Sequence, residues 1–206
     1  MRITMINKNV SKGKIKIILD NDESILISED VFFDKNLYED KEISQDEIEY
    51  LKFDCSKRLA KLTAIKFLIL KLRTNFEVFN NLKQKGFSEE IIEIVIKDLE
   101  MLGYLNDKIY VEKYIKDCEN LRAISLKKIE YNLLKKGIKR DLIETLIYMD
   151  EDVEFKKAFK ISENKFEKLK SDKDLYKKKL FNFLKNRGFN YKTIKRVYDE
   201  LTENKD

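Results

Sequence analysis

The residues of this sequence whose types and spacing could do chemistry are lysines and arginines that gather in two groups in its C-terminal half. Clustered cations bind phosphates by releasing counterions, and N–H groups at nearby helix N-termini add to such a site. The sequence therefore predicts a polyanion-binding surface. The candidates are Lys127, Lys128, Lys135, Lys136 and Arg140 in the first group, and Lys177, Lys178, Lys179, Lys185, Arg187, Lys192, Lys195 and Arg196 in the second.

The distribution of charge along the chain places the positive field at the C-terminal end. Residues 1–54 hold 8 basic and 13 acidic residues, whereas residues 155–206 hold 16 basic and 8 acidic ones. A second interpretation stays open, because 36 of the 43 basic residues are lysines, which also cover ordinary solvated helix faces.

Other kinds of chemistry have little support in the sequence. Histidine is absent, which excludes imidazole catalysis and histidine metal ligands. No phosphate-binding glycine loop or GxSxG motif occurs, and Cys55 and Cys118 form no CxxC pair, so we expect no enzyme, cofactor or metal and predict reduced, buried thiols in a cytosolic protein. The acidic run Asp150–Glu154 could be imagined as a metal site, but carboxylates at a helix start are the favoured interpretation.

Aromatic residues interleave with the second basic group and allow two interpretations. They could stack on bases, or they could belong to a core. Core packing is favoured, because three of them fall on or beside apolar positions that recur along the chain. The residues are Tyr176, Phe181, Phe189, Tyr191 and Tyr198.

The elements that must position these residues repeat along the chain. The stretch Leu82–Phe87 ends in Lys-Gly-Phe, and it returns at 133–138 and 184–189 with its glycines 51 residues apart. Glycine after the last turn of a helix is typical of a left-handed C′ position, and Ser88 is a typical N-cap for a following helix. The spacing predicts three helical units.

The composition favours a mainly α protein, with no proline and five glycines. We predict a tandem array of three three-helix repeats, curved and built from helix-turn-helix-like units, after a small N-terminal β-hairpin extension. In the N-terminal part, Ile15–Leu19 and Ile25–Ile27 read as a hairpin, to which Ile3–Ile6 could add a third strand. The predicted parts are an extension at 1–43, a first repeat with a lead-in helix at 44–105, a second repeat at 106–153 and a third at 154–206.

The first helix of each repeat is less sharply marked. Ser44 and Glu47 have the spacing of a capping box. The apolar pattern then runs through Cys55 to Leu72, with a break expected near Leu62 or Ala64 and one long helix as the alternative. The first helices of the other repeats are expected at 108–120 and 154–169. No apolar run approaches the roughly 20 residues that span a bilayer, and the N-terminus lacks a signal-peptide pattern.

These motifs together resemble the bacterial RecX proteins, regulators of the RecA recombinase. The resemblance rests on Leu82–Phe87, on Leu99–Asp107 ahead of Tyr110 and Tyr114, and on Leu133–Ile138. It extends to Asn186–Tyr191, which is similar to the closing Arg-Gly-Phe-Ser-Tyr element of the family, with Asn190 where serine is common. It covers roughly residues 55–201.

The resemblance implies a regulatory protein that lies in the helical groove of the RecA filament on DNA. It would restrain ATP hydrolysis, strand exchange and stimulated repressor cleavage, as a cytoplasmic monomer without membrane contact, and it could touch single-stranded or duplex DNA through the filament. Two alternatives stay open. One is a helix-turn-helix transcription factor whose helix after Gly188 enters a major groove, although Asn190–Thr193 lacks a clear base-reading set. The other is a helical-repeat scaffold for a different protein.

Overall fold

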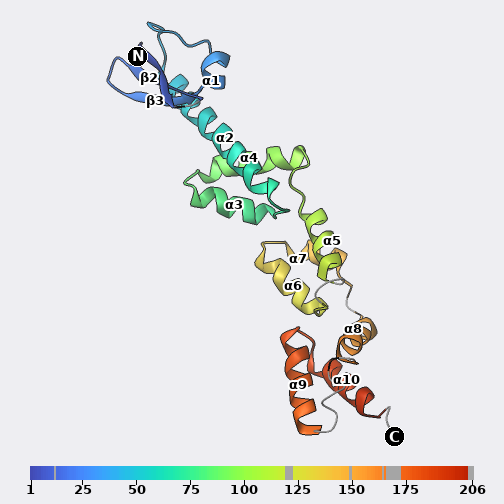
Figure 1. The fold of residues 1–206 in the computed structure, drawn as a ribbon. Coiled ribbons are helices and arrows are strands. Elements are labelled where there is room, and N and C mark those ends of the chain that lie inside the picture. Colours follow the sequence, from blue (N-terminus) through green and yellow to red (C-terminus); the bar gives the residue numbers. More distant parts are fainter. Residues whose placement is uncertain (12, 119–122, 149, 164, 166–172, 204–206) are drawn as a thin grey trace. The chain divides into compact units, whose positions relative to one another are not determined.

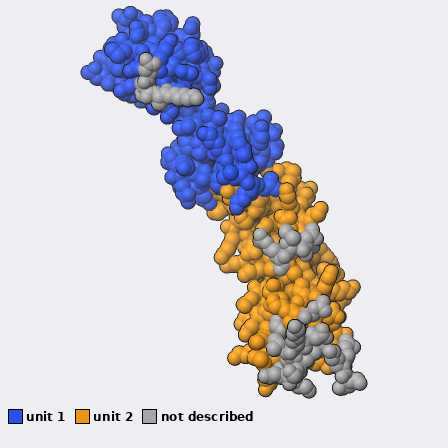
Figure 2. All heavy atoms as spheres, viewed as in Figure 1, with its two compact units in different colours: residues 1–72, 78–105 blue, residues 73–77, 106–206 orange. Residues whose placement is uncertain are grey.

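The computed structural model describes residues 1–206 apart from positions 12, 119–122, 149, 164, 166–172 and 204–206 (Figure 1). The chain divides into two compact units, drawn in two colours in Figure 2. Unit 1 comprises residues 1–72 and 78–105, and unit 2 comprises residues 73–77 and 106–206. Within the described residues, no helix combines the length and apolar content that crossing a lipid bilayer requires.

Unit 1 begins with a three-stranded antiparallel sheet in the order β1-β2-β3, which confirms the predicted hairpin and its third strand. The strands are β1 (Ile3–Ser11), β2 (Lys14–Leu19) and β3 (Ser24–Ser28). Ile15, Ile17 and Leu19 are buried, because alternate side chains of a strand point to the same face. They form a core with residues of the helices that follow.

A short helix that the sequence analysis did not predict follows the sheet. Helix α1 (Glu29–Asp34) starts at Ser28, whose hydroxyl accepts a hydrogen bond from the N–H of Val31. It buries Val31 and Phe32 against the sheet core. The Ser28-Glu29-Asp30 sequence carries the N-cap signal, but six residues are too few to show a helical period.

Helix α2 (Gln45–Ile69) is one continuous helix, so the break expected near Leu62 or Ala64 is wrong. Its start is as predicted, because Ser44 and Glu47 form a reciprocal capping box. Its N-terminal half contributes Ile48 to the sheet core and its C-terminal half contributes Ala60 and Ala64 to the next core. A single helix therefore serves two cores, which explains why its apolar face changes direction without a proline or glycine to break it.

The described residues form three sets of three helices, as the repeat spacing predicts (Figure 1). The first set is α2, α3 (Asn75–Gln84) and α4 (Glu89–Met101), the second is α5 (Asp107–Asp117), α6 (Leu126–Lys135) and α7 (Arg140–Leu146), and the third is α8 (Glu151–Glu163), α9 (Lys173–Asn186) and α10 (Tyr191–Glu203). The expected ends of two first helices, at 120 and 169, lie outside the described residues. Each set has its own buried cluster of apolar side chains.

The repeated glycine ends the second helix of each set in the predicted left-handed conformation. Gly86, Gly137 and Gly188 have φ values of +86°, +76° and +89°. In each case the next residue donates its N–H to the carbonyl of a leucine five residues earlier, as Phe87 does to Leu82. This turn aims the third helix of the set back across the second.

Unit 2 contains two equivalent joints, defined here as contacts between the start of a helix and a repeated glycine turn. At the first, the Thr74 hydroxyl donates to the carbonyl of Lys136 at 2.7 Å, and at the second the Ser125 N–H donates to the carbonyl of Arg187 at 3.0 Å. The two pairs are shifted by 51 residues, so within unit 2 the same kind of helix start meets the same kind of turn twice.

A carboxylate reinforces each joint. The N–H of Asn75 donates to Asp107 and the N–H of Leu126 donates to Glu154, both at 3.0 Å. Each acceptor thus lies at the positive N-terminal end of a helix from the preceding repeat, where negative charge is favoured.

Candidate basic interaction surface

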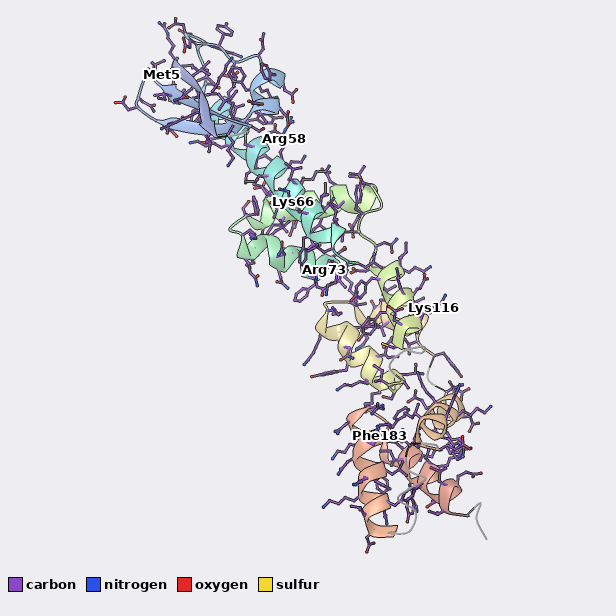
Figure 3. The ribbon with its side chains drawn as sticks, in the orientation of Figure 1. Met5, Arg58, Lys66, Arg73, Lys116 and Phe183 are labelled. Atoms are coloured by element: carbon purple, nitrogen blue, oxygen red, sulfur yellow. The ribbon has the colours of Figure 1, made fainter. Side chains whose placement is uncertain are left out.

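All thirteen basic candidates lie in unit 2, on its second and third repeats. Helix α6 carries Lys127, Lys128 and Lys135, Lys136 follows as its C-cap, and Arg140 begins α7; α9 carries Lys177, Lys178, Lys179 and Lys185, Arg187 lies in the turn after it, and α10 carries Lys192, Lys195 and Arg196. In Figure 3, long nitrogen-tipped side chains project outward from both α6 and α9. The two helices therefore present basic groups to solvent.

The lysines of α9 are exposed and belong to an amphipathic helix. Leu180 and Leu184 are fully buried in the third repeat core, and this packing fixes the face that remains in solvent. Lys178 and Lys185, seven residues apart, lie on the same exposed face. Among the described residues, no ion pair within 4.0 Å involves either of them.

Two candidates on α10 are engaged with α8. Lys192 lies 2.6 Å from Glu151 and Arg196 lies 2.7 Å from Asp152. The hydrogen bond from Arg196 and its charge lower the pKa of Asp152. These exposed pairs join the first and third helices of the repeat, so their cations are only partly free to meet another molecule.

The acidic run is a helix start, as its favoured interpretation predicts. Asp150 precedes α8, and its side chain accepts hydrogen bonds from the N–H groups of Asp152 and Val153. Glu154 points to the joint with α6, where burial raises its pKa and the hydrogen bond from the Leu126 N–H partly offsets that effect. In the part of the chain that the structure describes, no group of three or more side chains forms a metal-binding cluster.

Lys136 and Arg187 belong to the joints rather than to an open face. The ammonium of Lys136 lies 2.6 Å from a carboxylate oxygen of Glu77, with both side chains mostly buried. Burial alone would lower the pKa of Lys136, but hydrogen bonds to Glu77 and Tyr110 outweigh it and raise that pKa. At the equivalent position, the guanidinium of Arg187 stacks over the ring of Phe183, 3.8 Å from the ring centre.

The aromatic residues of the third repeat divide as the core interpretation expects. Tyr176 and Phe189 are 2% and 4% exposed. Phe181 and Tyr198 are half-buried against the same core, whereas Tyr191 is 70% exposed beside Phe181. Core packing is therefore confirmed for the two buried rings.

Sequence reasoning missed Tyr131, an aromatic residue on α6 between three of the candidate lysines. Its ring is 50% exposed, and the ammonium groups of Lys135 and Lys128 lie 4.7 Å and 5.5 Å from its centre. The hydrogen bond from Lys135 lowers the pKa of its hydroxyl, and the charge of Lys135 adds to this effect. The available signal was the spacing of Lys127, Tyr131 and Lys135 at four-residue intervals.

The two cysteines differ in their exposure. Cys118 is buried and Cys55 is half-buried, and the two are not joined in a disulfide. Burial raises the pKa of Cys55, which keeps its thiol protonated at neutral pH. The prediction of a buried thiol is confirmed for Cys118, whereas Cys55 is only half-buried.

Comparisons with known proteins agree with the repeat architecture. Residues 60–99 match the family model for the first three-helix domain of RecX. The chain is 31% identical to the regulatory protein RecX of Clostridium perfringens (strain SM101 / Type A) over 98% of this chain and 95% of that protein. It is 35% identical to the regulatory protein RecX of Finegoldia magna over 96% of this chain and 98% of that protein.

Two solved structures share the fold. A crystal structure of regulatory protein RecX aligns with a TM-score of 0.69 at 22% identity and covers 96% of this chain and 98% of the solved chain. A crystal structure of RecX from Lactobacillus salivarius aligns with a TM-score of 0.62 at 28% identity, covering 72% of this chain and 97% of the solved one. Because relatives that are 31% and 35% identical align with nearly the whole chain, the chain belongs to the RecX family of regulatory proteins.

Proposed function

We propose that this protein binds the filament that the RecA recombinase forms on DNA, lies in the helical groove of that filament and mainly inhibits RecA ATPase, strand exchange and coprotease activity. The observation that carries the proposal is the exposed basic surface of α6 and α9 in a member of the RecX family. The protein is then a regulator of homologous recombination, DNA repair and the SOS response. It is not an enzyme, and it acts in the cytoplasm as a monomer without a cofactor.

The repeat architecture supports this function physically. Successive units of similar size present equivalent faces, which suits a partner that is itself repetitive. Exposed lysines such as Lys178 and Lys185 keep part of their hydration when they bind, so the cost of desolvating them is small. They attract an acidic or phosphate-bearing groove over a Debye length of about 8 Å at physiological salt. Among the thirteen basic candidates, Lys136 and Arg187 lie at the joints and Lys192 and Arg196 pair with α8. The remaining candidates are the set that we expect to meet the filament.

The helix-turn-helix transcription factor has less support. The side chain of Asn190 accepts the Thr193 N–H at 2.7 Å, so it caps α10. Thr193 is 6% exposed and Lys192 pairs with Glu151. The first turn of α10 thus spends its polar groups within the protein, which leaves few to read base edges.

The experiment that separates the two functions is a pair of binding titrations with labelled full-length protein. One uses RecA assembled on single-stranded DNA with a slowly hydrolysed ATP analogue, and the other uses duplex DNA of varied sequence without RecA. We expect saturable binding to the filament and no preference among duplexes. Tight binding to one duplex sequence over competitor DNA, without RecA, would instead favour the transcription factor.

A further inference from the structure

Helix α6 places an exposed aromatic ring in the middle of a basic stripe, defined here as Lys127, Lys128, Tyr131 and Lys135. Lys127, Tyr131 and Lys135 follow one another at intervals of four residues, which is a rise of about 6 Å each along one helix face. Lys128 flanks Tyr131 from the adjacent row, with its ammonium 5.5 Å from the ring centre. The opposite face, with Ile129 and Leu133, is fully buried.

The stretch of sequence that carries the stripe is strongly basic. Residues 126–140 hold 6 basic residues and one acidic residue, Glu130. Glu130 lies one residue, about 100°, around the helix from Tyr131. Among the described residues, no ion pair within 4.0 Å involves the three lysines of the stripe.

Packing does not account for Tyr131. Tyr131 is 50% exposed. At the equivalent positions of the other two repeats, α3 has Asn80 and α9 has Asn182, so the second helix of a repeat forms without an aromatic ring there. Lys135 likewise corresponds to Gln84 and Asn186. An aromatic ring between lysines is therefore a property of the second repeat and not of the repeat fold.

We propose that the α6 stripe binds single-stranded nucleic acid, with the ring of Tyr131 stacked on one base and the three lysines on the neighbouring phosphates. Single-stranded nucleic acids are held by aromatic rings that stack on unpaired bases and by cations that track the backbone. The stripe has both at adjacent positions, and a duplex would offer it only phosphates. This inference deepens the proposed function, on which its biological role rests, but the contact itself can be measured without RecA.

Carboxylates beside Lys127 limit the path that a bound nucleic-acid strand can take along the stripe. Lys127 borders a cleft of about 290 Å³ whose other walls include Asp150, Glu151 and Glu154. Those carboxylates repel phosphates, so the strand is expected to leave Lys127 and continue past Lys135.

Tryptophan is absent from the chain, which allows a direct test of stacking. The variant Tyr131→Trp has a single tryptophan, whose emission is quenched when a base stacks on it. Tyr38→Trp is the matched control, because Tyr38 is 58% exposed and lies in the N-terminal part of unit 1. Titrated with oligo(dT), Tyr131→Trp should lose emission in step with the anisotropy of the labelled oligonucleotide, while Tyr38→Trp should not. Saturable binding without quenching of the tryptophan at 131 overturns the proposal.

Affinity measurements separate stacking from charge. Tyr131→Leu should weaken oligo(dT) binding about fivefold or more, while Tyr131→Phe retains it. Replacing Lys127, Lys128 and Lys135 by Gln should make the negative slope of log affinity against log salt shallower by about 2, since each charge contributes about 0.7. The control replaces Lys113, Lys156 and Lys160, exposed lysines of α5 and α8, by Gln. Helicity by circular dichroism checks that each variant folds.

Equal loss in the control triple, or unchanged affinity of Tyr131→Leu, contradicts the proposal. Binding of oligo(rU) with the same quenching supports it, because stacking and phosphate contacts are common to RNA and DNA. If the wild-type protein inhibits RecA ATPase but its Tyr131→Trp variant shows no quenching by any single strand, the site is wrong and the proposed function stands. If quenching occurs but the wild-type protein does not inhibit RecA ATPase, the single-strand site stands and the proposed function is wrong.

Discussion

The hydroxyl of Thr74 donates a 2.7 Å hydrogen bond to the backbone carbonyl of Lys136. The contact recurs 51 residues later, where the backbone of Ser125 meets the carbonyl of Arg187. Each carbonyl belongs to the residue directly before a repeated glycine. The 51-residue spacing of the repeated glycines therefore places the residue before the glycine in a joint in the second and third copies, in addition to shaping the turn itself.

The ion pair at the first joint should contribute to stability. Glu77→Gln leaves the ammonium of Lys136 mostly buried without its carboxylate, so we expect a loss of about 1–2 kcal/mol in the free energy of unfolding, between the values for exposed and buried pairs. Hydrogen exchange of the amides in 126–138 should report the loss locally. Glu89→Gln is the matched control, because Glu89 forms an exposed pair with Lys83 at a similar distance, and this substitution should cost much less than Glu77→Gln. Equal effects of the two variants contradict the expected role of the joint.

The same pair gives stability a pH dependence in acid. Burial opposes ionisation of Glu77, but hydrogen bonds from Lys136 and the Thr74 N–H together lower its pKa below 4.5. A lowered pKa in the folded state stabilises the fold fully above the unfolded pKa, and this contribution is lost as pH falls through the folded pKa. Urea unfolding followed by circular dichroism should thus show a wild-type advantage over Glu77→Gln that is constant at pH 6–7 and shrinks below about pH 4.5. An advantage that grows in acid contradicts the assignment.

The three repeated glycines should differ in their tolerance of alanine. At Gly86 a Cβ meets nothing within 4 Å, so Gly86→Ala costs only the left-handed backbone, about 1 kcal/mol. At Gly188 a Cβ would lie 2.6 Å from the Cβ of Lys128, and at Gly137 2.2 Å from the Cβ of Phe76. Both substitutions should cost about 2 kcal/mol or more, because the joint must open. Thermal unfolding of the three variants measures the order, and a cost at Gly86 as large as at Gly188 contradicts it.

The cations of α10 should be nearly neutral for stability. Lys192 and Arg196 form exposed pairs with α8, so Lys192→Gln and Arg196→Gln should each change the free energy of unfolding by about 0.5 kcal/mol or less. The guanidinium of Arg196 also lies 4.0 Å from the centre of the Phe155 ring, and this cation–π contact adds a small contribution to stability. A larger loss would show that the pairs hold the repeat together, and it would confuse any binding measurement made with these variants.

Much of this fold could be predicted from the sequence, because local signals and repetition agree. Ser44, Ser88 and the glycines at 86, 137 and 188 are explicit signals for helix ends, and each is used as such. The continuity of α2 could not be predicted, since its apolar face shifts from one core to another and mimics a break. Helix α1 is too short to show a period.

The candidate site was predictable in type but not in detail. A lysine has the same letter whether it is free, as at Lys178, or held in a joint, as at Lys136, and the distinction comes from Glu77, a residue 59 positions away. Arg187 was a candidate for phosphate contact, but its carbonyl and its guanidinium both contact neighbours within unit 2. Sequence spacing cannot show such long-range pairing. Tyr131 was missed because aromatic residues were considered only beside the second basic group, and Tyr131 lies in the first.

The exposed lysines of α9 give the sharpest prediction on binding. Changing Lys177, Lys178, Lys179 and Lys185 to Glu should weaken binding to the RecA filament and flatten its dependence on salt, while helicity is retained. The earlier candidate Arg187 is left unchanged, because its contacts with Ser125 and Phe183 would confuse folding with binding. Charge reversal at Lys113, Lys156 and Lys160 is the control. Filament binding equal to wild type would mean that these α9 lysines are only a solvated helix face.

Restraint of RecA by this protein can be measured as the rate of ATP hydrolysis by RecA on single-stranded DNA while the purified full-length protein is added. We predict that the rate falls as the protein approaches stoichiometric amounts and that the α9 variant requires more protein for the same effect. An unchanged rate at stoichiometric amounts of a folded wild-type protein would contradict the proposed inhibition of RecA.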